Sequence, residues 1–351
     1  MSSPPARVAL LGYGLAGAVF HAPLIAAVEG LELDAIVTRN DERRARAQRE
    51  HPEAILLESD DDVWRRAAEL DLVVVATPNR THVPLARAAI EAGLPVVVEK
   101  PLAASADEAR GLIDQARNRD VMLTVFQNRR WDGDFLTVRR LVDDGALGPV
   151  FRMESRFDRW RPNLAGGWRE LSDPDEAGGL LYDLGSHLVD QALLLFGPVA
   201  AVYAEVDTRR PGAEIDDDVF VALEHASGVR SQLWMTAVAA QPAARFRVLG
   251  ERAAYVKQGV DVQEALLREG VSPGPGWAEE QEEHWGVLGA GDDLRSVSTE
   301  AGAYQRFYEG VVEALRGAPP PVDPADAVAA LDVLAAAQTS ARERRVVSLD
   351  A

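Results

Sequence analysis

Residues 6–17 read Ala-Arg-Val-Ala-Leu-Leu-Gly-Tyr-Gly-Leu-Ala-Gly, and this stretch decides the fold. An apolar run at 8–11 leads directly into three glycines spaced as GxGxxG. In this pattern the first glycine permits a tight turn after a strand, the second lets a pyrophosphate approach the backbone, and the third lets a helix pack on the strand. The amide groups at the start of that helix favour bound phosphate. We therefore expect the following loop residues to bind a dinucleotide: Gly12, Gly14, Leu15, Ala16 and Gly17.

Around this loop, the first third of the chain alternates short apolar runs with helical stretches. Runs rich in β-branched residues predict six strands, at 8–11, 33–37, 54–57, 72–76, 95–98 and 122–126. The stretches between them predict helices, among them 41–50, 81–91 and 105–119. Strands alternating with helices are typical of βαβ units around a parallel sheet. Residues 1–126 are therefore expected to form a Rossmann domain with a doubly wound parallel sheet.

Beyond residue 126 the pattern changes, because several strands follow one another without helices. Strands are predicted at 151–157, 199–207, 219–224, 229–236 and 245–249, and helices at 176–196, 304–316 and 325–344. The segment 271–298 is expected to be an irregular surface excursion. The overall fold class is thus α/β, with residues 127–351 forming an α+β domain around a large, mostly antiparallel open sheet. We expect this domain to bind substrate and to mediate oligomerisation.

Composition excludes several classes of protein. The 351 residues are 47% hydrophobic and 26% charged, which is ordinary for globular domains and enough for two of them. The chain has no cysteine, so it has no disulfide, thiolate nucleophile or Cys-ligated metal. Its net charge of −19 and the absence of a basic stripe make nucleic acid an improbable partner. No membrane span or signal peptide is apparent, which predicts a cytoplasmic protein.

The end of the second strand indicates which dinucleotide binds. An acidic residue there would accept hydrogen bonds from the 2′-hydroxyl of NAD, but the sequence has Thr38 and Arg39. Asp34 lies at the wrong end of the strand. Thr38, Arg39 and Arg43 are suited to hold a 2′-phosphate, whereas Arg44 is read as part of a solvated helix face. We expect NADP as cofactor, with NAD possible.

Ligands of such a sheet lie beyond the C-terminal ends of its strands, so the segments that follow the strands are searched for chemistry. Glu99-Lys100-Pro101 follows the fifth strand. Only two of the 37 basic residues are lysines, which suggests that Lys100 supplies a compact ammonium group that donates a proton or a hydrogen bond. A surface lysine is the plainer alternative. Glu99 is interpreted as its ion-pair partner or as a residue that orients the cofactor site. The remaining cofactor candidates follow the fourth strand: Thr77, Pro78, Asn79 and His82.

Among the six histidines, His187 has the most suggestive neighbours. Asp183, His187 and Asp190 are spaced i, i+4 and i+7, which places them on one face of a predicted helix. A carboxylate beside an imidazole can orient the ring and stabilise its charged form, so that the ring accepts a proton from a substrate hydroxyl. A helix salt bridge and a metal site are alternative readings, and no metal is expected.

Aromatic and charged residues gather after the sixth strand and after the first strand of the second sheet. Trp, Arg, amide and carboxylate groups suit a polyhydroxylated ring, although each is as readily an interface contact. On a strand, Arg129 and Arg130 would not both point inward. The substrate-binding candidates are Asn128, Arg129, Trp131, Asp132, Arg161, Trp168, Asp183 and His187, with Trp160 and Arg169 beside them.

Taken together, these motifs resemble the glucose-fructose oxidoreductase / inositol dehydrogenase (Gfo/Idh/MocA) family over nearly the whole chain. The resemblance rests on four motifs: the Gly12–Gly17 loop, Thr77-Pro78-Asn79 with His82, Glu99-Lys100-Pro101, and Asp183 through His187. The resemblance implies a Rossmann domain, a second domain whose open sheet forms subunit contacts, and a nicotinamide cofactor. It also implies that Lys100, Asp183 and His187 surround the reacting carbon, and that a cis peptide bond precedes Pro101.

Several further stretches of the sequence are similar to the NADP-dependent scyllo-inositol dehydrogenase branch of that family. The matching stretches are 12–23, 127–135, 157–162, 168–170 and 255–257. The resemblance implies hydride transfer between NADP and a secondary alcohol or ketone of a cyclic polyol or sugar, in a homodimer or homotetramer. Two alternatives remain: an aldose, keto-sugar or dihydrodiol oxidoreductase, and a non-catalytic NADP-binding regulator, since a fold alone does not fix function.

Overall fold

The computed structural model describes residues 4–164 and 178–349, which form two compact units. The first unit comprises Met1–Asn128, Gln263–Trp277 and Ala303–Val328. The second comprises Arg129–Val262, Ala278–Gly302 and Ala329–Ala351. The later segments of the chain therefore contribute to both units.

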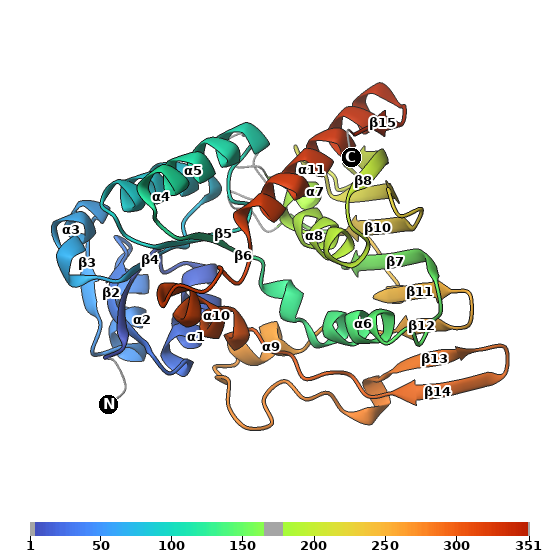
Figure 1. Ribbon diagram of the computed structural model, residues 1–351, viewed down its shortest axis with the longest axis horizontal. Coiled ribbons are helices and arrows are strands. Elements are labelled where there is room, and N and C mark those ends of the chain that lie inside the picture. Colours follow the sequence, from blue (N-terminus) through green and yellow to red (C-terminus); the bar gives the residue numbers. More distant parts are fainter. Residues whose placement is uncertain (1–3, 165–177, 350–351) are drawn as a thin grey trace. The chain divides into compact units, whose positions relative to one another are not determined.

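The first unit is built on a parallel six-stranded sheet in the order β3-β2-β1-β4-β5-β6 (Figure 1). Its strands are β1 Ala6–Leu11, β2 Leu31–Val37, β3 Ile55–Leu57, β4 Leu72–Val75, β5 Val96–Glu99 and β6 Leu123–Phe126. All four residues of β4 are fully buried, as expected for a central strand covered on both faces. The predicted doubly wound parallel sheet is confirmed.

Helices cover both faces of this sheet, with α4 and α5 on one side and α1 and α10 on the other (Figure 1). The chain enters the first of them through a π-helical turn, η1, which continues into α1. The helical elements are η1 Ala16–His21, α1 Ala22–Ala27, α2 Asp41–Glu50, α3 Asp60–Arg65, η2 Ala67–Glu69, η3 Asn79–Thr81, α4 His82–Glu91, α5 Ala106–Arg119, α9 Gln263–Arg268 and α10 Gln305–Leu315.

The second unit contains a nine-stranded sheet in the order β14-β13-β12-β11-β7-β10-β9-β8-β15. All pairings are antiparallel except β7 with β10. The mostly antiparallel sheet predicted from the sequence is thus confirmed. The strands are β7 Val150–Asp158, β8 Val199–Asp207, β9 Asp218–His225, β10 Arg230–Thr236, β11 Phe246–Gly250, β12 Ala254–Lys257, β13 Gly286–Ala290, β14 Asp293–Val297 and β15 Val347–Ser348.

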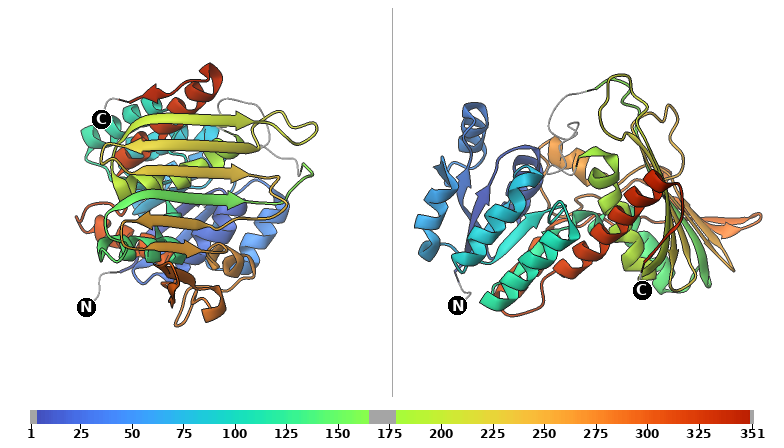
Figure 2. Two further views of the ribbon diagram at one scale, coloured as in Figure 1. Left: turned by 90° about the vertical axis from the view of Figure 1, so that its right-hand side faces the viewer. Right: turned by 90° about the horizontal axis from the view of Figure 1, so that it is seen from above.

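Helices of this unit pack against one face of the sheet, while the left-hand view of Figure 2 shows the other face without a helix over it in the described part of the chain. Along β10 the covered face receives Ser231, Leu233 and Met235, all fully buried. The helical elements are η4 Asn128–Trp131, which begins in the first unit, α6 Gly133–Asp143, α7 Gly179–Asp183, α8 Gly185–Phe196, η7 Glu282–His284 and α11 Pro324–Glu343, which also begins in the first unit.

Two sequence predictions about this unit are wrong. The segment 271–298 is not irregular throughout, because β13 and β14 form a hairpin at the edge of the sheet, turning through residues 291 and 292. Gly291 takes a positive φ of 57° there, as tight hairpin turns require. The helix predicted at 176–196 is two helices, because α7 ends at Asp183 and α8 starts at Gly185; residues 176 and 177 lie outside the described part.

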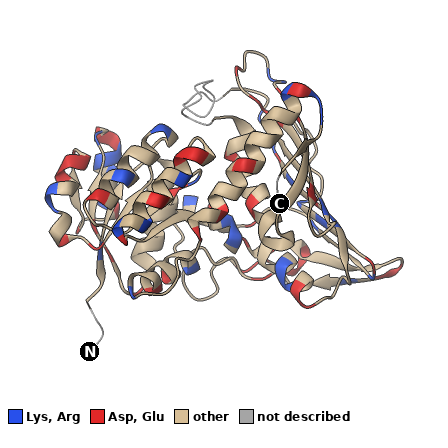
Figure 3. Ribbon diagram, turned by 45° about the horizontal axis from the view of Figure 1, so that its top comes forward, with Lys and Arg blue, Asp and Glu red and all other residues tan. Residues whose placement is uncertain are grey.

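Charge is distributed without segregation. Figure 3 shows acidic and basic residues interspersed along the helices of the first unit. Among the described residues, no helix is long and apolar enough to cross a membrane.

Candidate functional site

The glycine loop connects β1 to η1, and its geometry requires glycine. Gly12 has a φ of 99°, and a Cβ atom at this residue would collide with the carbonyl oxygen of Ala76. A Cβ atom on Gly17 would collide with the carbonyl oxygen of Gly12. Beside Gly14, a Cβ atom would meet only the flexible guanidinium of Arg43 within 4 Å. This open cradle at the start of a helix fits a bound pyrophosphate.

Arginines lie close to the end of β2. The Nη1 atom of Arg43 is 3.6 Å from the Cβ position of Gly14, and Thr38 is buried. Arg39 is 77% exposed, and its Nε donates to the carbonyl oxygen of Glu58. Arg44 donates to the carbonyl oxygen of Leu56, so it packs on β3 rather than lying on a solvated face.

Asp34, by contrast, does not belong to this site. Its carboxylate accepts a hydrogen bond from Arg7 at 2.5 Å and pairs with Arg66 at 2.9 Å. This acidic residue is therefore held in an ion-pair cluster in the middle of β2, four residues before Thr38.

The loops after β4 and β5 are tied together by His82. Its Nδ1 lies 2.8 Å from the carbonyl oxygen of Pro101, and its Nε2 lies 3.0 Å from that of Thr77. Burial is the main reason why the pKa of this histidine is lowered. Asn79, three residues before His82, is also buried. The Lys100–Pro101 peptide bond is cis. The predicted residues of both loops thus lie at one edge of the sheet.

The carboxylate of Glu99 contacts both the backbone of Lys100 and the ring of His21. One carboxylate oxygen accepts the backbone N–H of Lys100 at 2.9 Å, and the other lies 3.2 Å from Nε2 of His21. The Nδ1 atom of His21 is in turn 2.5 Å from the hydroxyl of Tyr308. Tyr308 was not among the residues that the sequence indicated for the site.

Arg129 and Arg130 follow β6, and both are buried, contrary to the argument that only one of them points inward. They lie in the 3-10 turn η4 rather than on a strand, and such a turn can direct consecutive side chains to separate partners. Arg129 pairs with Asp132 at 3.2 Å. Arg130 makes a two-pronged hydrogen bond to Asp190, at 2.5 and 2.8 Å.

That pairing changes the interpretation of the Asp183–Asp190 segment. Asp190 was grouped with His187 as part of a general-base face, but its carboxylate binds Arg130. α7 ends at Asp183 and α8 begins at Gly185, with Leu184 between them in a right-handed helical conformation, so Asp183 and His187 lie on consecutive helices. His187 is 5% exposed.

The helix that carries Asp183 is held at its start by Asp216. The carboxylate of Asp216 accepts the backbone N–H of Leu181 at 2.8 Å. Gly179 has a φ of 82°, and a Cβ atom there would collide with this carboxylate. Burial raises the pKa of Asp216 to about 6. The sequence analysis overlooked this contact, because residues 179 and 216 are far apart in the chain.

The remaining substrate candidates differ in their surroundings. Asn128 and Asp132 are buried, whereas Trp160 is 59% exposed and Arg161 is also exposed. Trp168 and Arg169 lie outside the described residues. No group of three or more histidine, aspartate or glutamate side chains able to hold a metal ion occurs within 4–164 and 178–349.

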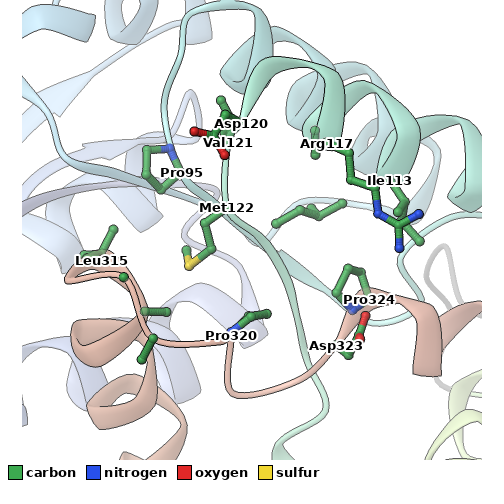
Figure 4. Close-up of a pocket in the computed structure, with 15 residues that line it drawn as sticks. Pro95, Ile113, Arg117, Asp120, Val121, Met122, Leu315, Pro320, Asp323 and Pro324 are labelled. Atoms are coloured by element: carbon green, nitrogen blue, oxygen red, sulfur yellow. The ribbon is translucent and has the colours of Figure 1, made fainter.

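A cavity of about 580 Å³ lies in the first unit, but at the wrong edge of the sheet for the cofactor (Figure 4). Pro95 and Met122 border it, and they immediately precede β5 and β6. The glycine loop follows the C-terminal end of β1, whose neighbours in the sheet are parallel to it. The cavity therefore lies at the N-terminal edge.

Comparison with known proteins identifies the class and then the family. Residues 6–127 match the model described as oxidoreductase family, NAD-binding Rossmann fold, and residues 135–256 match the GFO/IDH/MocA C-terminal domain. The fold and the glycine loop therefore define an NAD(P)-binding oxidoreductase. The chain belongs to the Gfo/Idh/MocA family.

Full-length relatives support this assignment. Uncharacterized oxidoreductase YdgJ of Escherichia coli (strain K12) is 38% identical, over 98% of both chains. The scyllo-inositol 2-dehydrogenase (NADP(+)) IolW of Bacillus subtilis (strain 168) is 33% identical, over 98% of this chain and 96% of IolW. The solved structure of yvaA from Bacillus subtilis superposes with a TM-score of 0.93 at 33% identity and covers 100% of both chains.

Proposed function

We propose that this protein is an NADP-dependent dehydrogenase that oxidises a secondary alcohol of a cyclic polyol, with an inositol as the preferred substrate class. The observation that carries the proposal is the placement of Lys100 directly after β5, at the edge of the sheet where the glycine loop follows β1. An amine donor beside a dinucleotide cradle suits hydride transfer to or from a carbon that bears oxygen.

The preference for NADP rests on charge near the cradle. The guanidinium of Arg43 faces Gly14, and no carboxylate takes the position at the end of β2 where a ribose hydroxyl would be bound. Asp34 is engaged in ion pairs and does not serve as the carboxylate that would bind the ribose hydroxyl. The relative IolW carries NADP(+) in its name, which agrees with this preference.

When bound, a nicotinamide cofactor would provide the hydride chemistry of the reaction. His187 removes the proton from the reacting hydroxyl, and Lys100 donates a hydrogen bond to the same oxygen. Asp183 positions the substrate. Thr38, Arg39 and Arg43 would hold the 2′-phosphate of the cofactor, and the residues of the glycine loop would hold its pyrophosphate. Residues of the 127–351 region, among them Asn128, Arg129, Trp131, Asp132, Arg161 and Trp168, contact the hydroxyls of the ring.

A glucoside ring is the second candidate substrate. D-Glucoside 3-dehydrogenase of Escherichia coli (strain K12) is 32% identical over 56% of this chain, and it too is named for a secondary alcohol on a polyhydroxylated ring. The two candidates share the cofactor and the chemistry, and they differ in the shape of the ring that binds.

The uncovered face of the nine-stranded sheet supports a proposed contact between two copies of the chain. On this face Trp234 lies 5.0 Å from Phe220, centroid to centroid, and the guanidinium of Arg156 stacks 3.4 Å above Trp234. Aromatic and arginine side chains are enriched in such interfaces. Light scattering on the purified protein tests the assembly, and a Trp234→Glu variant should become monomeric.

Replacing His187 tests the mechanism. We expect His187→Ala to lower kcat by about 10²- to 10⁴-fold, the usual contribution of a general acid–base group, while NADP⁺ still binds. Steady-state rates with an inositol and a fluorescence titration with NADP⁺ provide the two measurements. Unchanged turnover would remove His187 from the mechanism.

A further inference from the structure

A chain of buried side chains leads from α10 to Lys100. The hydroxyl of Tyr308 contacts Nδ1 of His21, Nε2 of His21 contacts one oxygen of Glu99, and the other oxygen of Glu99 accepts the backbone N–H of Lys100. His21 and Tyr308 are both fully buried, and the side chain of Glu99 is 13% exposed. All four residues belong to the first unit.

The surroundings of Glu99 determine its charge. Burial favours the neutral form of Glu99, but the hydrogen bond and charge of His21, together with the charges of Lys100 and His82, outweigh it and hold the pKa of Glu99 below its ordinary value. Glu99 is therefore a carboxylate that accepts Nε2–H of His21. In a neutral ring Nδ1 accepts the O–H of Tyr308, and in a charged ring Nδ1–H donates to the Tyr308 oxygen, so in both forms the hydroxyl is hydrogen-bonded to the ring.

Aromatic packing fixes the imidazole between its two partners. The ring of His21 lies 4.4 Å from that of Phe126, centroid to centroid, and Phe126 packs edge-to-face on Phe307 at 4.9 Å. His21 is also the last residue of the π-helical turn that follows the glycine loop. Such turns are rare and are frequently found at functional sites.

We propose that His21 and Tyr308 are positioning residues for Lys100, which act through Glu99 to fix the backbone from which the lysine side chain extends. This inference rests on the role proposed for Lys100. Glu99 has both oxygens engaged, one by His21 and one by the backbone of Lys100, so releasing one side frees the carboxylate to turn and the Lys100 backbone to move.

Three variants test the chain one bond at a time. Tyr308→Phe removes only the hydroxyl that orients the ring. His21→Leu removes the donor to Glu99, while His21→Gln keeps an N–H group at the distance of Nε2. Tyr255→Phe is the matched control, because it deletes a buried hydroxyl in the second unit that has no hydrogen-bond partner among the described residues.

The first measurement compares the kcat and the KM of each variant with those of the wild-type protein. We expect kcat to fall about 5-fold in Tyr308→Phe and about 10- to 100-fold in His21→Leu, with the KM for the polyol little changed and His21→Gln largely restored. Loss of the His21 donor raises the pKa of Glu99, so the acid limb of the kcat profile moves to higher pH in His21→Leu. The groups that face Glu99 are His21, His82, Lys100 and Tyr308. Tyr255→Phe should leave the kcat profile in place.

The second arm needs no substrate. The chain has two lysines, so biosynthetic labelling with ¹³Cε-lysine gives two side-chain signals. We expect the Lys100 signal to move in Tyr308→Phe and His21→Leu. The Lys257 signal should stay, since that residue is buried in an ion pair with Glu280 in the other unit. This arm decides the inference even if no polyol is oxidised, an outcome that would refute the proposed function alone.

Three results would overturn the inference. The first is an unmoved Lys100 signal in both variants, whatever happens to kcat. The second is a wild-type kcat and pH profile in Tyr308→Phe and His21→Leu. The third is an equal loss of kcat in the control, which would indicate general destabilisation. If His21→Leu does not fold, Tyr308→Phe carries the test.

Discussion

Two neighbouring aspartates should respond to pH in opposite senses. Asp216, which holds the start of α7, has a pKa raised by burial to about 6, against an ordinary value of 3.8. Asp217 is also buried, but hydrogen bonds from Arg209 and Arg210 outweigh that burial and hold its pKa below the ordinary value. Replacing each by asparagine removes one titration and leaves the shape nearly unchanged.

The sign for Asp216 follows from proton linkage. Between about pH 4 and pH 6 the folded protein keeps a proton on Asp216 that the unfolded chain releases, so this group lowers the free energy of unfolding as pH rises. The whole difference, from 3.8 to about 6, corresponds to about 3 kcal/mol at about 1.36 kcal/mol per pKa unit. Roughly 2 kcal/mol of it falls between about pH 4.5 and pH 7.5.

The prediction compares each variant with wild type. Relative to wild type, Asp216→Asn should gain roughly 2 kcal/mol of stability between about pH 4.5 and pH 7.5, because the amide oxygen still accepts the N–H of Leu181 without carrying charge. Asp217→Asn should lose stability relative to wild type as pH rises out of the acid range, since the carboxylate that Arg209 and Arg210 stabilise is gone.

Urea unfolding at a series of pH values, followed by fluorescence, measures the free energy of unfolding of each variant and of wild type in the same buffers. Hydrogen exchange at the amide of Leu181 reports the local effect on α7. The reasoning would be refuted if the difference in free energy of unfolding between Asp216→Asn and wild type did not change with pH. It would also be refuted if this difference changed with pH in the same direction for both variants.

Three further predictions concern the cofactor cradle and the second unit. Arg43→Ala should weaken NADP⁺ binding about 10- to 100-fold, the usual worth of a hydrogen bond to a charged group, and leave NAD⁺ binding unchanged, as measured by fluorescence titration. Gly17→Ala should weaken binding of both cofactors at least about 10-fold, because its Cβ atom collides with the Gly12 carbonyl. Gly111→Ala on α5 is the control and should leave binding unchanged, because a Cβ atom there has no neighbouring atom within 4 Å. Arg130→Met should cost about 3–5 kcal/mol in urea unfolding by leaving Asp190 charged and buried, and Arg130→Met with Asp190→Leu should recover most of it.

Local pattern was sufficient to predict the fold class. Each strand of the first sheet contains an apolar run, and the first glycine of the loop, Gly12, takes a positive φ that favours glycine. The hairpin of β13 and β14 also has a local signal in Gly291-Asp292, but the acidic and glycine-rich surroundings hid it.

The details of the site depend on contacts that sequence spacing does not reveal. His21 and Tyr308 are 287 residues apart, so nothing in the chain near either one indicates their hydrogen bond. The single helix predicted at 176–196 is divided at Leu184, so Asp183 and His187 belong to two consecutive helices. Burial of Arg130 likewise depends on Asp190, which lies 60 residues further along.

The central claim is that the chain oxidises a ring alcohol with NADP⁺. The most direct measurement is the appearance of reduced nicotinamide at 25 °C when the purified protein is mixed with NADP⁺ or NAD⁺ and each of a panel of inositol isomers, glucosides and aldoses. We predict turnover of an inositol with NADP⁺ preferred over NAD⁺, and its loss in His187→Ala. Tight NADP⁺ binding with no turnover across the panel would contradict the claim.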